Sequence, residues 1–278
     1  LVPFTAYLLI LTDWRTTWLV MGAVILLLGV PLIALVVRSY PSEMGLQPDG
    51  SGALSKGQKS SHAPTGPLEA ERWRDPLSSS PMWQLSLAYL VCGVTTASIA
   101  VHFVRWAESE SISAGTAAAA FGLLSGVNGL SVLAVGFLSD RMPRRVLLGA
   151  IYLIRGVAFL SLVVLPGQAA LWGFALIGGL SWLATVPLTT ALAADMYGLR
   201  HLGILAGFIN MVHQIGGAAA VFAFGLVFDR YGSYDPAYLA GAALLLFAGL
   251  TALSIRERRY SARYSPVAAT GAGDASGP

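Results

Sequence analysis

The sequence predicts an all-α membrane protein, built as a polytopic bundle of helices. Hydrophobic residues make up 55% of the 278 residues, and Asp, Glu, Lys and Arg together make up only 11%. A soluble domain carries roughly 25% charged residues, so this chain lacks the polar groups needed to cover a folded surface in water. Its apolar residues also fall in uncharged stretches of about 20, the length that a helix needs to cross a bilayer. A water-soluble monomer is therefore excluded.

Seven such stretches lie along the chain, at residues 16–37, 82–104, 112–139, 146–165, 169–190, within 201–228, and at 236–255. The uncharged run after Arg155 is too long for one crossing, and we expect Pro166 and Gly167 to divide it into a helix pair. Residues 1–11 are apolar but cover only half a span, so the chain is expected to begin partway through a helix.

Charges at the ends of these stretches predict the orientation. Thirteen of the 17 Lys and Arg residues fall on one side, in the connections 39–80, 140–145 and 195–202, in the tail after residue 255, and at Arg38 on the membrane edge. The positive-inside rule makes this side cytoplasmic. We therefore expect a multi-pass protein of the inner or plasma membrane with a cytoplasmic C-terminus. Nucleic acid is not an expected partner, because the basic residues mark membrane boundaries instead of gathering on one face.

The chain divides into four parts. Residues 1–38 hold the first span and the half-span before it, and residues 39–80 form a cytoplasmic linker rich in Pro, Gly and Ser. Residues 81–257 hold the other six spans, and 258–278 are a small, polar cytoplasmic tail. The linker and the tail cannot bury a core, so we expect a largely mobile linker and a disordered tail.

Enzyme signatures are absent from the sequence. It has no phosphate-binding GxxxxGK[ST] loop, no HExxH pair, no GxSxG and no metal-spaced Cys and His. We therefore expect no enzymatic activity, no cofactor and no metal. The single cysteine, Cys92, is expected to be a small apolar filler.

One basic motif lies on the short connection between the third and fourth spans, with the sequence GFLSDRMPRR from Gly136 to Arg145. It resembles the signature loop of the major facilitator superfamily, roughly G-x-x-x-D-R-x-G-R-R, with Pro143 where glycine is usual. The resemblance implies a gating loop made of Gly136, Asp140, Arg141, Arg144 and Arg145. Glycine permits close helix packing, and the charged groups can hold helix ends together.

Three other stretches extend the resemblance, at residues 13–50, 101–117 and 197–234. Residues 13–50 resemble the sixth helix and its exit, and residues 101–117 resemble the seventh helix and the start of the eighth. Residues 197–234 are similar to the tenth-to-twelfth helix region of the bacterial monocarboxylate-transporter-like and oxalate/formate-antiporter-like branch. The likeness covers about residues 1–259 and implies the end of the fifth helix, the sixth, and the whole C-terminal six-helix half. The missing N-terminal helices of the same protein would then be its partner, and the two halves would rock around a central site.

Polar side chains inside spans are the candidate site residues, because burying them in a bilayer is unfavourable without partners. Asn210, His213 and Gln214 share one face of the sixth predicted span by their i, i+3 and i+4 spacing. They are predicted to bind substrate, with hydrogen bonding between helices as the open alternative.

Two further residues carry charge or titrate near neutral pH. Arg155 is the only charge within a full span, and it either binds an anionic substrate or pairs inside the bundle. His102 lies near the outer end of its span and either carries a coupled proton, a role also predicted for His213, or anchors the helix at the interface.

Weaker candidates for substrate binding lie on two other spans. Trp182 and Thr185 belong to a polar stripe with Ser181 and Thr189, on a helix that Pro187 is expected to bend. Asn128 lies between serines on the third span. Serine and threonine in membrane helices often hydrogen-bond to their own backbone, so these positions alone are weak evidence for a substrate site.

The sequence as a whole predicts a secondary transporter that moves a small organic anion, such as a monocarboxylate, across a lipid bilayer. Proton coupling is left open. The alternatives are efflux of a hydrophobic compound and a non-transporting membrane sensor on the same fold.

Overall fold

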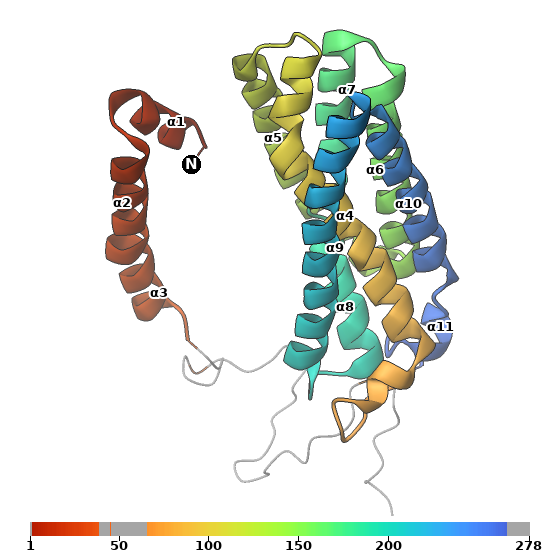
Figure 1. The fold of residues 1–278 in the computed structure, drawn as a ribbon. Coiled ribbons are helices and arrows are strands. Elements are labelled where there is room, and N and C mark those ends of the chain that lie inside the picture. Colours follow the sequence, from red (N-terminus) through yellow and green to blue (C-terminus); the bar gives the residue numbers. More distant parts are fainter. Residues whose placement is uncertain (1, 39–44, 46–65, 266–278) are drawn as a thin grey trace, which may run out of the picture. The chain divides into compact units, whose positions relative to one another are not determined.

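A computed structural model describes residues 2–38, 45 and 66–265 (Figure 1). The chain separates into two compact units, residues 1–61 and 62–278. Within the described residues the secondary structure is helical, which confirms the all-α prediction. In the part of the chain that the structure describes, six helical segments are long and apolar enough to cross a membrane.

The first unit holds α1 (Val2–Leu11) and one continuous span, 14–36, made of α2 (Trp14–Val24), the π-helical turn η1 (Ile25–Gly29) and α3 (Val30–Val36). The π turn follows from Pro31, which has no N–H to donate to the carbonyl four residues earlier. The Val30 N–H accordingly donates to the Ile25 carbonyl, five residues back.

Asp13 caps the start of this span. Its Oδ1 accepts hydrogen bonds from the backbone N–H groups of Arg15, at 2.7 Å, and Thr16, at 3.0 Å. Its Oδ2 accepts another from the Thr16 hydroxyl at 3.0 Å. These donors, with the Thr16 backbone N–H foremost, hold the pKa of the Asp13 carboxyl below its ordinary value.

The second unit is a bundle of long helices that run side by side (Figure 1). Its elements are the short 3₁₀ helix η3 (Asp75–Ser78), α4 (Ser80–Ser109), α5 (Ala114–Arg141), α6 (Arg144–Val164), α7 (Gly167–Gly179), α8 (Thr185–Tyr197), α9 (Leu202–Tyr231), α10 (Asp235–Ser254) and α11 (Glu257–Tyr260). Helix α4 packs mainly against α9, and α6 against α10 and α7. We call the end that carries the α5–α6 connection the loop end.

Glycines bring α4 and α9 into direct backbone contact. A methyl group added at Gly93 would overlap the backbone carbonyl of His213. One added at Gly216 would lie 2.6 Å from the Leu90 carbonyl oxygen. Small residues at such crossings let membrane helices approach closely, because lipid provides no hydrophobic drive for association.

The predicted span 169–190 is interrupted. Helix α7 ends at Gly179, residues 180–184 form turns, and α8 begins at Thr185 and continues to Tyr197. The expected bend at Pro187 is wrong: this proline lies in the first turn of α8, where a missing N–H removes no helical bond. Because Ser181 lies in the break, it does not share one helical face with Thr185 and Thr189.

Most of the linker lies outside the described residues, but its last part packs on the bundle. The Leu68 N–H donates to the Met196 carbonyl at 2.8 Å, and the Ser79 hydroxyl lies 2.6 Å from the Tyr197 hydroxyl. The start of the tail also departs from the predicted disorder. Residues 257–260 form α11, and the Ala262 N–H donates to the Asp195 carbonyl at 2.9 Å.

Candidate functional site

A hollow of about 380 Å³ with both polar and apolar side chains in its lining lies between α4, α8 and α9. We call it the Tyr89 pocket. It is lined by Tyr89 from α4, by Val186, Thr189 and Thr190 from α8, and by Ala206, Gly207, Ile209 and Asn210 from α9. The absence of larger side chains at Ala206 and Gly207 leaves room on the α9 side.

Polar groups in this pocket retain free hydrogen-bonding capacity. The Thr189 hydroxyl is buried and has no partner among the described residues. The Asn210 side chain is exposed and makes no hydrogen bond within the described part of the chain. Buried polar groups in proteins normally have partners, so an unpaired hydroxyl beside a hollow indicates a place where a polar solute can bind.

The predicted trio on α9 lies in and beside this pocket. Asn210 lines the pocket directly. The half-buried His213 ring packs on Tyr89, with 4.6 Å between ring centroids, and its Nδ1 lies 2.9 Å from the Gln214 side-chain oxygen. Their role in substrate binding stays a prediction.

Arg155 lies deeper in the bundle and is completely buried. Its Nη1 lies 3.2 Å from the Cys92 sulfur and 3.5 Å from the Thr95 hydroxyl. Its Nη2 donates to the backbone carbonyls of Ser181 and Trp182. Arg155 makes no ion pair with a carboxylate among the described residues. The described residues therefore provide partners for most of the Arg155 N–H donors, but they provide no negative charge that neutralises the guanidinium.

The other weak candidates gather at the α7–α8 break and not in the Tyr89 pocket. The Asn128 Oδ1 accepts from the Leu183 N–H at 2.9 Å, and the Ser131 hydroxyl donates to the Leu180 carbonyl. The Thr185 hydroxyl oxygen lies 3.2 Å from the Cys92 sulfur, and the centroid of the Trp182 ring lies 5.6 Å from the Arg155 guanidinium carbon. All of these side chains are buried.

His102 lies 13 residues beyond Tyr89 along α4, a rise of about 20 Å. Its Nε2 is 2.9 Å from the Val221 carbonyl oxygen, which can only accept, so this nitrogen carries a proton. Its Nδ1 lies 3.2 Å from the Tyr234 hydroxyl, and the ring stacks near Phe224. The two predicted proton carriers are therefore well separated, and His102 joins α4 to α9.

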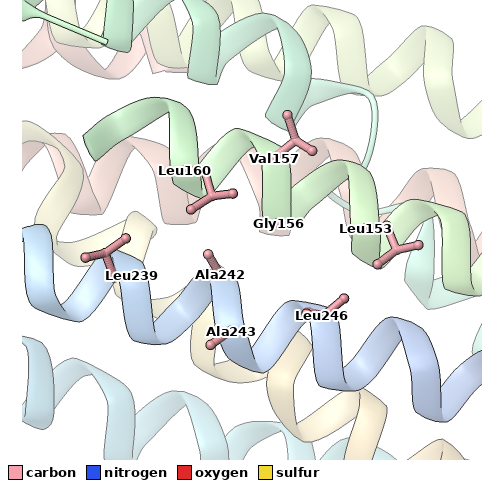
Figure 2. Close-up of a pocket in the computed structure, with 8 residues that line it drawn as sticks. All are labelled: Leu153, Gly156, Val157, Leu160, Leu239, Ala242, Ala243 and Leu246. Carbon is pink, nitrogen blue, oxygen red and sulfur yellow. The ribbon is translucent and has the colours of Figure 1, made fainter. Parts of the chain in front are cut away.

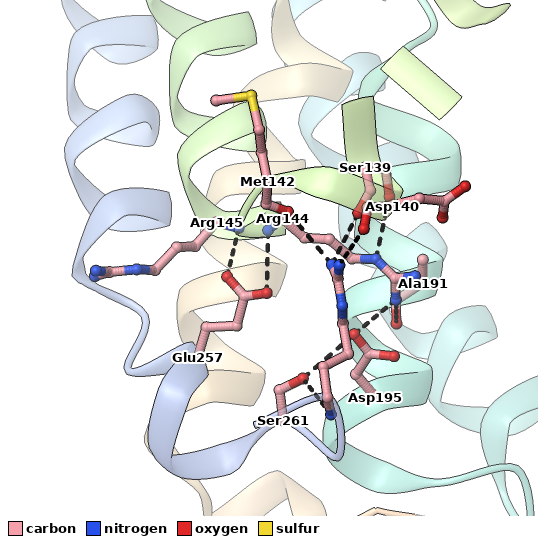
Figure 3. Close-up of polar contacts among 10 residues, drawn as sticks. Ser139, Asp140, Met142, Arg144, Arg145, Ala191, Asp195, Glu257 and Ser261 are labelled. Carbon is pink, nitrogen blue, oxygen red and sulfur yellow. Dashed lines mark hydrogen bonds and ion pairs between the residues drawn. The ribbon is translucent and has the colours of Figure 1, made fainter. Parts of the chain in front are cut away.

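Figure 3 shows how the basic loop contacts the rest of the loop end. The buried Glu257 carboxylate accepts from the backbone N–H groups of Arg144 and Arg145, both at 3.0 Å. The Arg144 side chain pairs with Asp195 at 2.6 Å and donates to the Ser139 hydroxyl at 3.1 Å. These contacts hold the α5–α6 connection to α8 and α11.

The remaining loop residues make different contacts. The Arg145 side chain donates to the Leu253 carbonyl at 2.8 Å. Arg141 lies over the Phe137 ring at 3.5 Å, and the Asp140 backbone carbonyl accepts from Arg263 at 3.0 Å. Gly136 has open space around it within the described residues, so the expected close helix approach there is not observed. The gating role of these residues stays a prediction.

The sequence did not predict the contacts that the loop makes with Glu257, Asp195 and Arg263. The signal for Glu257 was its place as the single acidic residue in the basic run of residues 256–259. A buried anion at the start of a helix is favourable because the first backbone N–H groups have no helical partner.

A second hollow of about 410 Å³ lies between α6 and α10 and is lined only by Leu, Val, Ala and Gly (Figure 2). It offers no side-chain hydrogen-bonding group. This distinguishes it from the Tyr89 pocket as a place for a polar solute.

The fold is that of a polytopic membrane protein, and comparison with known proteins identifies its family. The sequence model of the Major Facilitator Superfamily matches residues 1–221, and the chain belongs to this superfamily. That family consists of membrane transporters and not of enzymes.

Two known proteins illustrate the similarity. The chain is 29% identical over 247 residues to the uncharacterized MFS-type transporter YcxA of Bacillus subtilis (strain 168), covering 86% of this chain and 55% of YcxA. Its fold resembles the crystal structure of the fucose:proton symporter FucP of E. coli, with a TM-score of 0.55 and 20% identity over 65% of this chain and 45% of FucP. The chain therefore spans about half the length of these proteins.

Proposed function

We propose that this chain supplies the C-terminal half of a secondary active transporter that moves a small organic anion by alternating access. A monocarboxylate is the simplest substrate of this class. The observation that carries the proposal is Arg155, a buried cation with no carboxylate partner among the described residues. Arg155 contacts Cys92, which lies about one helical turn after Tyr89 on α4. Cys92 in turn contacts Thr185, which lies about one turn before Thr189 on α8.

The position of the charge favours an anion in the Tyr89 pocket. At a given distance, two charges interact more strongly in an apolar interior than in water. The Arg155 guanidinium therefore favours an anion in the pocket without contacting it. The threonine hydroxyls and the Asn210 amide supply short-range hydrogen bonds. A volume of about 380 Å³ is within the range of small-molecule sites.

His213 is proposed as the proton carrier. It contacts the Tyr89 ring at the pocket. Among the described helices, Asp and Glu residues occur only in first or last turns, so no carboxylate competes for this role in mid-helix. Substrate and proton would then bind within one region, as coupling requires.

We further propose that the protein lies in a bacterial inner membrane or a plasma membrane, with the loop end facing the cytoplasm. The Lys and Arg residues at the helix boundaries support this orientation through the positive-inside rule. The N-terminal helices that complete the cavity would come from the longer parent protein.

The test is flux through the full-length parent protein in liposomes with an imposed pH gradient. Lactate and its neutral isostere lactamide form a matched pair of solutes. We expect saturable uptake of lactate that exceeds uptake of lactamide by about tenfold or more, which corresponds to about 1.4 kcal/mol. Equal uptake of both, or no uptake of either, would contradict the anion proposal.

Efflux of a hydrophobic compound is the second candidate. It is favoured by an apolar hollow of about 580 Å³ between α4, α9 and α10, lined mainly by small and aliphatic side chains. Gradient-dependent extrusion of an apolar dye, without lactate uptake, would support it. Solute binding with no flux of any kind would instead favour a non-transporting sensor.

A further inference from the structure

The α7–α8 break exposes backbone groups that a continuous helix would satisfy. Four of them are bonded by side chains from other helices. The Leu180 carbonyl accepts from Ser131, the Ser181 and Trp182 carbonyls accept from Arg155, and the Leu183 N–H donates to Asn128. Non-helical backbone within a membrane is stable only where such partners exist.

These partners come from two helices at defined positions. Asn128 and Ser131 lie three residues apart on α5, so they face the break together. Arg155 reaches it from the middle of α6. Neither α7 nor α8 provides these four bonds, so the conformation of the break depends on how α5 and α6 pack against it.

The break is also connected to the Tyr89 pocket. Thr185 is the first residue of α8 and contacts Cys92, which also contacts Arg155. Thr189 lines the pocket one turn further along α8, and Tyr89 lines it one turn before Cys92 on α4. Arg155 therefore contacts both the break and the helix that forms the opposite wall.

We propose that Asn128, Ser131 and Arg155 are positioning residues that hold the α7–α8 break and thereby place the Thr189 wall of the pocket. This inference rests on the proposed function only where it treats the Tyr89 pocket as the solute site. It assigns Asn128 and Arg155 a role through the backbone and not through contact with substrate.

The alternative role for these side chains is to stabilise the fold in general, with no effect on the pocket. A fold-stabilising residue would change the amount of folded protein. A positioning residue would also change substrate affinity in the molecules that do fold. The test therefore measures local opening at the break and affinity in the same variants.

The experiment uses the full-length parent protein in lipid nanodiscs and liposomes, with the variants Asn128→Ala, Ser131→Ala and Ser131→Thr. Ser125→Ala is the matched control, because this exposed α5 serine bonds, among the described residues, only the Phe121 carbonyl of its own helix, at 2.9 Å. Amide hydrogen exchange at Leu183 reports opening of the break. The KM and kcat for lactate uptake, normalised to folded protein, report the pocket.

In Asn128→Ala we expect exchange at Leu183 to be about fivefold faster, the factor that corresponds to the net worth of one hydrogen bond. We expect KM to rise in Asn128→Ala and Ser131→Ala with a smaller change in kcat. Ser131→Thr keeps the hydroxyl and should restore KM, and Ser125→Ala should match the unmodified protein.

Unchanged exchange at Leu183 in Asn128→Ala, or unchanged KM in both alanine variants, would overturn the inference. If the parent protein transports no lactate, the proposed substrate class fails. The exchange measurement would still decide whether Asn128 holds the break, and lactate binding to nanodiscs would replace KM as the measure of affinity.

Discussion

The Nη1 atom of Arg155 lies 3.2 Å from the sulfur of Cys92 inside the helix bundle. This contact joins α6 to α4 and gives a role to a cysteine whose expected function was only to fill space. The same guanidinium bonds two carbonyls of the α7–α8 break. One side chain therefore contributes a charge near the pocket and a set of hydrogen bonds that shape its wall.

Charge and hydrogen bonding at Arg155 are separable by substitution. Arg155→Lys keeps the charge with fewer donors, and Arg155→Gln keeps an amide donor without the charge. If the charge sets anion preference, Arg155→Gln should weaken lactate affinity by about tenfold, since a unit charge acting over about 10 Å at an effective dielectric constant of about 20 contributes about 1.7 kcal/mol. Arg155→Lys should lose less affinity than Arg155→Gln, because it keeps the charge and loses only part of the hydrogen bonding to the break. Equal losses in the two variants, measured by lactate binding, would contradict a role for the charge.

Proton coupling is expected to depend on His213 and not on His102. In His213→Gln, a pH gradient should no longer drive uptake, while exchange of labelled for unlabelled solute should continue. In His102→Gln, the amide can still donate to the Val221 carbonyl, so gradient-driven uptake should be retained. The two variants are compared in the same liposome assay, and the reverse pattern would assign coupling to His102.

Glu257 is expected to stabilise the loop end. Removing its carboxylate in Glu257→Ala leaves two N–H groups at the start of α6 without their charged partner, so we expect a loss of about 2–3 kcal/mol in the free energy of unfolding. Glu257→Gln should lose less, because its amide oxygen still accepts one bond. The measurement is thermal unfolding in detergent.

The control for this prediction is Glu110→Gln. Glu110 is an exposed acidic residue at the end of α4, and its substitution should change stability by no more than about 0.5 kcal/mol. A Glu257→Ala protein as stable as Glu110→Gln would show that the carboxylate is not needed to hold α6.

Asp13 is expected to make the start of the first span sensitive to acid. The pKa of the Asp13 carboxyl is lowered in the folded chain, first by the hydrogen bond from the Thr16 backbone N–H. The stabilisation that the ionised carboxylate gives to the start of the span is therefore present above the unfolded-state pKa, and it is lost as pH falls through the lower folded-state pKa. Amide exchange at Thr16, corrected for intrinsic rates, should therefore accelerate at pH values below about 4. Asp13→Asn keeps an acceptor without titrating and should remove this pH dependence. Identical profiles for both proteins would contradict the prediction.

Much of the architecture was predictable from the sequence, because hydropathy is a local property. Apolar stretches of the right length predicted the six candidate spans found among the described residues, and the pair Pro166 and Gly167 correctly marked the turn before α7. Helical periodicity also placed Asn210 and His213 on one face, and both lie at the Tyr89 pocket. For these features the relevant physics acts within one helix or between one helix and the bilayer.

The interior of the bundle was decided by tertiary structure. Pro187 suggested a bend, but the break lies at residues 180–184, where Asn128, Ser131 and Arg155 satisfy its backbone. Glu257 lies directly before the segment that was expected to be disordered, and its carboxylate caps the start of α6. A single sequence shows which polar groups must find partners in an apolar environment. Which partners they find depends on the packing of helices that are distant along the chain, because a hydrogen bond forms only between groups that the fold brings within about 3 Å.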